Sequence, residues 1–145
     1  MNISKIREVK TPNRGTSKSA GIDFFVPNDF EKITLQPGES SCIPSGIKAD
    51  VPEGFALIVF NKSGVALKRN LSVGACVIDE DYQGEIHLHV YNFGTKLETI
   101  SPGEKLVQMI LIPVFYDSVN EVELDSLFVK ETARGTGGFG STGLV

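Results

Sequence analysis

The sequence has 145 residues, a formal net charge of −4 and 41% hydrophobic residues, which suits a single domain with its own core. The acidic balance argues against a nucleic-acid partner, which would require a basic surface. No membrane segment is expected, because the longest apolar run, LVQMILIPVF, is about half the length of a membrane helix.

The polar start, MNISKIREVK, lacks the apolar segment of a signal peptide, so a cytoplasmic protein is expected. The two cysteines, Cys42 and Cys76, lie far apart and match neither a zinc-binding spacing nor a redox pair. Both are predicted to be free, buried thiols.

Short strands are expected along most of the chain, because 15 glycines and 7 prolines punctuate it at the intervals typical of strands and turns. The segments predicted to form strands are residues 19–27, 32–38, 42–54, 55–60, 71–79, 84–94 and 104–114. Alternation is clearest in 84–94, where apolar side chains share one face and polar ones the other: Ile86, Leu88 and Val90 against His87, His89 and Tyr91. The histidine face is interpreted as a surface or interface stripe.

Only residues 63–70, SGVALKRN, suit a short helix, and Ser63 is its predicted N-cap. The pattern indicates an all-β fold of the sandwich, jelly-roll or small-barrel class. The one compositional break, near Ala133, predicts a core over residues 1–133 and a flexible, glycine-rich C-terminal arm over residues 134–145, both within a single domain.

The C-terminal arm carries one cation, one aromatic ring and a row of unshielded backbone amides. A disordered terminus is the usual fate of such a composition. Alternatively, Arg134 and the neighbouring N–H groups form an anion-binding nest, and Phe139 offers a face for stacking a base. A kinase or Walker nucleotide loop is excluded, because neither a lysine-bearing strand nor a Walker lysine follows the glycines.

Acidic side chains offer candidates for catalysis or metal binding. In VIDEDYQGE, Asp79 and Asp81 lie two apart and share a face if the segment is a strand. Either could be a general base or a metal ligand, or the segment is a solvated turn. Asp23, between apolar residues, is either a paired core carboxylate or part of a site.

Two further segments suit phosphate binding. Lys62, Ser63 and Gly64 could hold a phosphate oxygen at a strand end, or they could simply begin a helix. Gln108 stands in an apolar strand, so its amide either bonds to backbone or faces a ligand.

Taken together and in order, five segments resemble the five motifs of the trimeric deoxyuridine triphosphatases: AGIDFF, NKSGVA, GACVIDEDYQGE, GEKLVQ and RGTGGFGSTG. The resemblance runs from about Ser19 to Gly143, and the third and fifth motifs are the most specific. It implies an all-β, distorted jelly-roll subunit of the β-clip type and a homotrimer with active sites at the subunit contacts. It also implies Mg²⁺-dependent hydrolysis of dUTP to dUMP and pyrophosphate, which keeps uracil out of DNA and supplies dUMP.

The resemblance implies a role for each matching residue. Asp79 is the expected general base for the water that attacks the α-phosphorus, Tyr82 lies under the deoxyribose, and Asp23 reaches Mg²⁺ through water. The other matching positions are expected to contact phosphates, base or both: Lys62, Ser63, Gly64, Gln108, Arg134, Gly138, Phe139, Ser141 and Thr142.

Main-chain groups from Gly74 to Val77 are expected to read the base. Uracil presents one N–H donor between two carbonyl acceptors, and an opened strand pair can match that edge. Cytosine inverts the pattern at two of the three positions. Each group left unpaired costs about 1–3 kcal/mol, which is enough for strong discrimination.

The sequence departs from the family pattern at three places. Asn61-Lys62 stands where Pro-Arg is usual, and Lys105 stands where arginine is frequent. Lysine keeps the charge but lacks the planar fork of arginine. Cys76 replaces a common glycine within the base-reading segment.

Two other functions are weighed against dUTP hydrolysis. A deoxycytidine triphosphate deaminase shares the fold, but it requires an acid and donors aimed at C4 of the base, and no such motif is found. A nucleotide-sensing interaction protein would use the closed arm as a signal.

Overall fold

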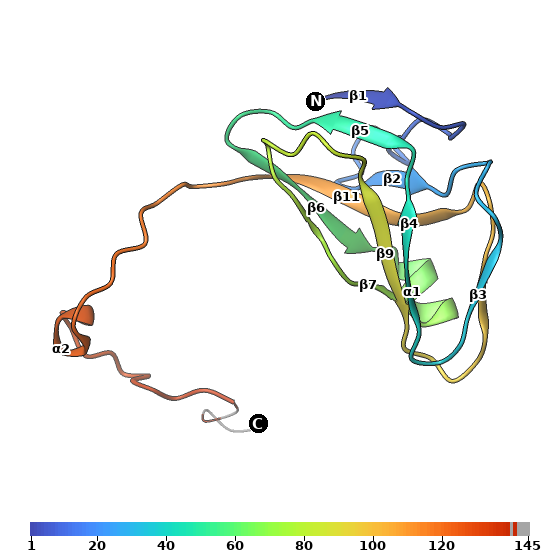
Figure 1. Ribbon diagram of the computed structural model, residues 1–145. Coiled ribbons are helices and arrows are strands. Elements are labelled where there is room, and N and C mark those ends of the chain that lie inside the picture. Colours follow the sequence, from blue (N-terminus) through green and yellow to red (C-terminus); the bar gives the residue numbers. More distant parts are fainter. Residues whose placement is uncertain (140, 142–145) are drawn as a thin grey trace. The chain divides into compact units, whose positions relative to one another are not determined.

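The computed structural model describes residues 1–139 and 141. The chain divides into two units, Met1–Phe115 and Tyr116–Val145. The first unit holds all of the strands found among the described residues (Figure 1). Its β-branched and aromatic runs, bounded by glycine and proline turns, form short antiparallel strands.

Two main sheets make up the first unit. The larger has the order β2-β11-β6-β8 and comprises β2 (Ile22–Phe25), β11 (Lys105–Pro113), β6 (Phe55–Asn61) and β8 (Val77–Ile78). The other has the order β4-β9-β7 and comprises β4 (Ser40–Pro44), β9 (His87–Asn92) and β7 (Leu71–Val73). Two-stranded sheets join β1 (Asn2–Lys5) to β5 (Ile47–Asp50), and β3 (Ile33–Leu35) to β10 (Glu98–Ile100).

Both main sheets contribute apolar side chains to one core. Phe24, Leu57 and Met109 come from the larger sheet and are fully buried, as are Ile43 and Leu88 of the other sheet. The alternation predicted for 84–94 is confirmed, since the apolar set is buried and the polar set is exposed or half-buried. The all-β, jelly-roll-like fold class predicted from the sequence is likewise confirmed.

The predicted short helix is α1 (Ser63–Arg69), but its N-cap is Lys62 rather than Ser63. Lys62 has an extended backbone, and its carbonyl accepts the first helical bond from the Ala66 N–H at 2.9 Å. None of the described side chains caps this end. At the other end Arg69 donates to Glu98 at 2.9 Å and to Glu104 at 2.7 Å, which fixes α1 against the strands.

Several sequence predictions need correction. The segment 42–54 is two strands, because Gly46 takes a left-handed turn at φ +72° between β4 and β5. The segment 71–79 is likewise interrupted between β7 and β8. Both β1 and β10 were missed. The cysteines are free but not buried, since Cys42 is exposed and Cys76 is half-buried.

The described part of the second unit contains one helical turn, α2 (Leu124–Leu127), and a series of turns. Arg134 Nε donates to the Gly137 carbonyl at 2.9 Å, and the Ser141 N–H donates to the Gly138 carbonyl at 3.0 Å. The predicted division at residue 133 remains a prediction. Within the described residues, no helix has the length and apolar character needed to cross a membrane.

Candidate active site

A cavity of about 210 Å³ lies where the chain passes from β7 to β8 and turns back towards β9. Its wall contains Asp79 and Tyr82, both predicted site residues, together with Val77. The remaining lining residues lie within 75–78 and 85–87: Ala75, Cys76, Ile78, Glu85, Ile86 and His87. One concave surface therefore combines backbone from residues 75–78, a carboxylate and an aromatic ring.

The 74–76 segment is held open by contacts to both sheets. The Gly74 N–H donates to the His89 carbonyl at 2.9 Å, and the Ala75 N–H donates to Nδ1 of the same histidine at 2.9 Å. On the other side, the Cys76 carbonyl accepts from the Val59 N–H at 2.8 Å. A side chain at Gly74 would stand 2.1 Å from His89 Nδ1, so only glycine fits there.

The turn after β8 places Asp79 and Tyr82 side by side in the cavity wall. The Tyr82 N–H donates to the Asp79 carbonyl at 3.2 Å, and the Tyr82 hydroxyl donates to the Glu85 carbonyl at 2.9 Å. Asp79 is exposed, and its carboxylate has no protein hydrogen-bond partner among the described residues. An exposed carboxylate without a protein partner is free to accept a hydrogen bond from a water molecule.

Asp23 lies at the centre of a three-residue ionic cluster. Its buried carboxylate accepts from Lys62 Nζ on one oxygen and from Lys105 Nζ, at 3.0 Å, on the other. Both lysines therefore contact the same acid, although they lie in different motifs. Burial would raise the pKa of Asp23, but the hydrogen bonds and charges of the lysines outweigh burial and lower that pKa.

Asn61 and Gln108 organise the turn that precedes α1. The Gln108 side chain donates to the Asn61 carbonyl at 2.8 Å, so its amide is bonded to backbone. The Asn61 side chain accepts from the Val73 N–H at 2.8 Å and donates to Ser72 Oγ at 3.1 Å. These bonds link the phosphate-turn candidates Ser63 and Gly64, both exposed, to the strand that leads into the cavity.

The predicted residues within the first 115 fall into two groups. Val77, Asp79 and Tyr82 line the cavity, whereas Asp23, Lys62 and Gln108 belong to networks near the start of α1 and do not line it. Of the tail residues, Arg134, Phe139 and Ser141 are exposed and Gly138 is half-buried within the second unit. The predicted Thr142 lies outside the described residues. Sequence reasoning interpreted His89 only as a surface or interface residue, and so missed that His89 supports the backbone of residues 74–76.

The family model described as dUTPase matches residues 7–143. The deoxyuridine 5′-triphosphate nucleotidohydrolase of Chlamydia pneumoniae is 43% identical over 134 residues, covering 91% of this chain and 90% of that protein. The human mitochondrial protein of the same name is 36% identical over 144 residues, covering 99% of this chain and 54% of that protein. The chain belongs to the dUTPase family.

Solved structures support the same fold. A G164S mutant of the dUTPase of Staphylococcus bacteriophage 80alpha, bound to dUpNHpp, superposes with a TM-score of 0.86 over 99% of this chain and 98% of that chain, at 22% identity. A dUTPase from phage phi11 of Staphylococcus aureus, described with a structural Mg(II) ion, gives a TM-score of 0.76 over 84% of this chain and 95% of that chain.

The side chains of this dUTPase family member bear on metal binding. The described residues hold no group of three or more His, Cys, Asp or Glu that could bind an ion by themselves. Both oxygens of Asp23 are bonded to lysines, which does not suit direct coordination. The side chains present fit a cation held mainly by phosphate oxygens and water, as Mg²⁺ commonly is.

The ionic cluster makes stability depend on pH in a defined direction. Because the folded-state pKa of Asp23 lies below its unfolded value, the cluster stabilises the protein above about pH 4. That contribution is lost as the pH falls through the folded-state pKa. Asp23→Asn is expected to lower the free energy of unfolding at pH 7 by about 1–2 kcal/mol. The expected loss is kept this small because solvent screens the charge of the partly exposed Lys105.

Thermal unfolding measured between pH 7 and pH 3 tests this expectation. The gap between wild type and Asp23→Asn is expected to narrow as the pH falls below about 4, because the unfolded-state carboxyl takes up a proton there before the folded-state carboxyl, whose pKa is lower. Asp29→Asn is the matched control, because Asp29 makes only an exposed 3.6 Å ion pair with Arg7. A gap that stays constant across this range would contradict the assigned pairing.

Proposed function

We propose that this chain hydrolyses dUTP to dUMP and pyrophosphate in the cavity lined by residues 75–79, Tyr82 and residues 85–87. The observation that carries the proposal is the placing of Asp79 and Tyr82 in the wall of one cavity, in a chain of the dUTPase family. The reaction keeps uracil out of DNA and supplies dUMP.

The base is read by backbone between Gly74 and Val77. The Gly74 and Ala75 N–H groups and the Cys76 carbonyl are already bonded within the chain. Other main-chain groups of the segment therefore face the donor and acceptors of uracil. Because His89 and β6 fix this backbone, it cannot readily adjust to the inverted pattern of cytosine.

The sugar and the nucleophile are placed by the turn after β8. The ring of Tyr82 lies beneath the deoxyribose and leaves no room for a ribose 2′-hydroxyl. Asp79 accepts a proton from a water molecule as the water oxygen bonds to the α-phosphorus. The bond from the α-phosphorus to the bridging oxygen then breaks in line, and pyrophosphate leaves.

Backbone amides and cations stabilise the negative charge of the phosphates. The first N–H groups of α1, at Ser63 and Gly64, have no helical partner, and Gln108 holds the turn that presents them. Lys62 and Lys105 leave the Asp23 cluster with net positive charge. Mg²⁺, when bound to the triphosphate, would supply further charge neutralisation, and Asp23 is the residue that would hold it, through water.

The C-terminal arm completes the site in the assembled enzyme. The proposed assembly is a homotrimer in which the arm of one subunit covers the cavity of another. Arg134 binds the γ-phosphate, Phe139 covers the uracil ring, and Gly138, Ser141 and Thr142 add donors. Closure excludes bulk water and strengthens each charged contact.

The expected compartment is the cytoplasm.

A product assay tests the proposed activity directly. Purified protein with Mg²⁺ is given dUTP, dCTP or dTTP, and pyrophosphate, orthophosphate and ammonia are measured. Pyrophosphate from dUTP, with little product from the other two nucleotides, is the expected result. Ammonia from dCTP would indicate a deaminase, and nucleotide binding without any product would indicate a sensing protein; either outcome would overturn the proposal.

A further inference from the structure

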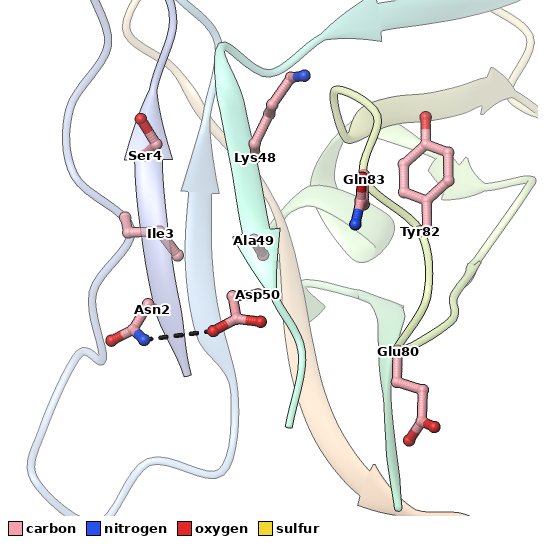
Figure 2. A pocket seen from close by; sticks show the side chains of 9 residues that line it. All are labelled: Asn2, Ile3, Ser4, Lys48, Ala49, Asp50, Glu80, Tyr82 and Gln83. Atoms are coloured by element: carbon pink, nitrogen blue, oxygen red, sulfur yellow. Dashed lines mark hydrogen bonds between the residues drawn. The ribbon is translucent and has the colours of Figure 1, made fainter. Parts of the chain in front are cut away.

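The turn that carries Asp79 forms a thin wall between two cavities. On one side lies the 210 Å³ cavity with Asp79. On the other lies a larger cavity of about 380 Å³, between the β1–β5 sheet and the turn. Figure 2 shows residues 2–4 and 48–50 on one side of this second cavity and Glu80, Tyr82 and Gln83 on the other. The turn therefore has little protein packed behind it.

Burial does not hold this turn in place. None of residues 79–85 is buried, whereas the flanking Ile78 and Ile86 are 8% and 1% exposed. The strand leading into the turn, β8, pairs with β6 over only two residues, Val77 and Ile78. Since the Asp79 side chain has no protein hydrogen-bond partner among the described residues, its position depends on the backbone on either side of it.

Glu80 ties that backbone to a distant, well-anchored turn. Its carboxylate accepts a hydrogen bond from the Gly54 N–H, in the turn between β5 and β6. Gly54 is itself fixed, because its carbonyl accepts from the Val114 N–H at 2.8 Å and its φ of +78° suits glycine alone. Among the described residues, the only other side-chain contact out of the turn is made by Glu85, at its far end, to the Gly46 N–H and Arg7.

We infer that Glu80 is a positioning residue for hydrolysis. By accepting a hydrogen bond from the Gly54 N–H, it holds the neighbouring Asp79 where the Asp79 carboxylate can take the proton of the water that attacks the α-phosphorus. This inference rests on the proposed function. A displacement of about 1 Å in a reacting group costs about 10²-fold in rate. Glu80 lines the 380 Å³ cavity and not the 210 Å³ cavity that Asp79 lines, so Glu80 acts through the backbone and not on the substrate.

Three variants of the full-length protein test the inference. Glu80→Ala removes the acceptor and is expected to lower kcat for dUTP by about 10- to 100-fold, with KM within about twofold of wild type. Glu80→Gln keeps an oxygen acceptor for the Gly54 N–H, so kcat is expected to recover to within about threefold of wild type. Glu53→Ala is the matched control, because Glu53 is an exposed acid in the same turn as Gly54.

Amide hydrogen exchange gives a readout independent of activity. The Gly54 N–H is expected to exchange faster in Glu80→Ala and at the wild-type rate in Glu80→Gln and Glu53→Ala. Wild type that hydrolyses dUTP, with Glu80→Ala equally fast, would overturn the inference while leaving the proposed function intact. So would a Glu80→Gln variant as slow as Glu80→Ala, since charge rather than the hydrogen bond would then matter. Wild type without dUTP hydrolysis would instead overturn the function.

Discussion

Replacing Asp79 with asparagine is expected to lower kcat for dUTP hydrolysis by about 10²–10⁴-fold. Asparagine has nearly the same shape but cannot take the proton of the attacking water. The cavity wall from residues 75 to 78 is unchanged by the substitution, so nucleotide binding is expected to remain within a few-fold of wild type. Steady-state pyrophosphate release gives kcat, and calorimetric titration with a non-hydrolysable dUTP analogue gives the affinity.

Asp81→Asn is the comparison that makes the Asp79 experiment specific. The two acids lie in one turn and the substitutions change the same charge, but only Asp79 lines the 210 Å³ cavity. Asp81→Asn is therefore expected to retain turnover within about tenfold of wild type. Full activity in Asp79→Asn would remove this residue from its role, and equal losses in both variants would point to the charge of the turn instead of one general base.

The sequence was most informative where one periodicity decides the structure. In residues 84–94, burial of Ile86, Leu88 and Val90 follows directly from alternation, because one face of β9 packs on the core. The strand β1 was missed because only Ile3 among its residues is even half-buried. Such a strand exists through pairing with β5, which its own residues do not reveal.

The errors about the cysteines and the helix cap have local physical causes. Along β4, Ile43 points into the core, so alternation turns Cys42 outwards despite the general preference of cysteine for burial. At α1 the expected cap was chosen by residue type. The backbone instead becomes helical one position earlier, and Lys62 takes the cap position while its side chain reaches Asp23.

The composition of the site was predictable only in part. Family motifs name Asp23, Lys62 and Lys105, but their separation in sequence hides that both lysines bind one carboxylate. This pairing gives a physical reason why lysines suffice at two positions where arginine is usual: each makes one bond to a shared acid, which needs no planar fork. The contact of Glu80 with Gly54 is equally invisible to sequence patterns, because it joins two turns through backbone.

Removing residues 134–145 is expected to leave a folded protein that has lost most of its turnover. Among residues 1–139 and 141, the core cluster contains none beyond Leu111, so the unfolding temperature is expected to change little. Without Arg134 and Phe139, the triphosphate lacks a cation and the base lacks a cover, and kcat/KM is expected to fall by about 10²-fold or more. Arg134→Ala and Phe139→Ala, assayed separately, divide this loss between phosphate and base contacts.

Subunit mixing decides whether the arm serves its own chain or a neighbour. Full-length Asp79→Asn protein has the arm but no general base, and truncated protein with Asp79 has the base but no arm. If the arm crosses to another subunit, trimers re-formed from both have some sites with Asp79 from one chain beneath the arm of the other. Activity well above the sum of the two parents is then expected. Differential labelling shows whether the mixtures exchange subunits. Mixtures that exchange subunits but stay inactive would place the arm over its own chain's cavity. A truncated enzyme as fast as wild type would refute the proposal that the arm is a lid.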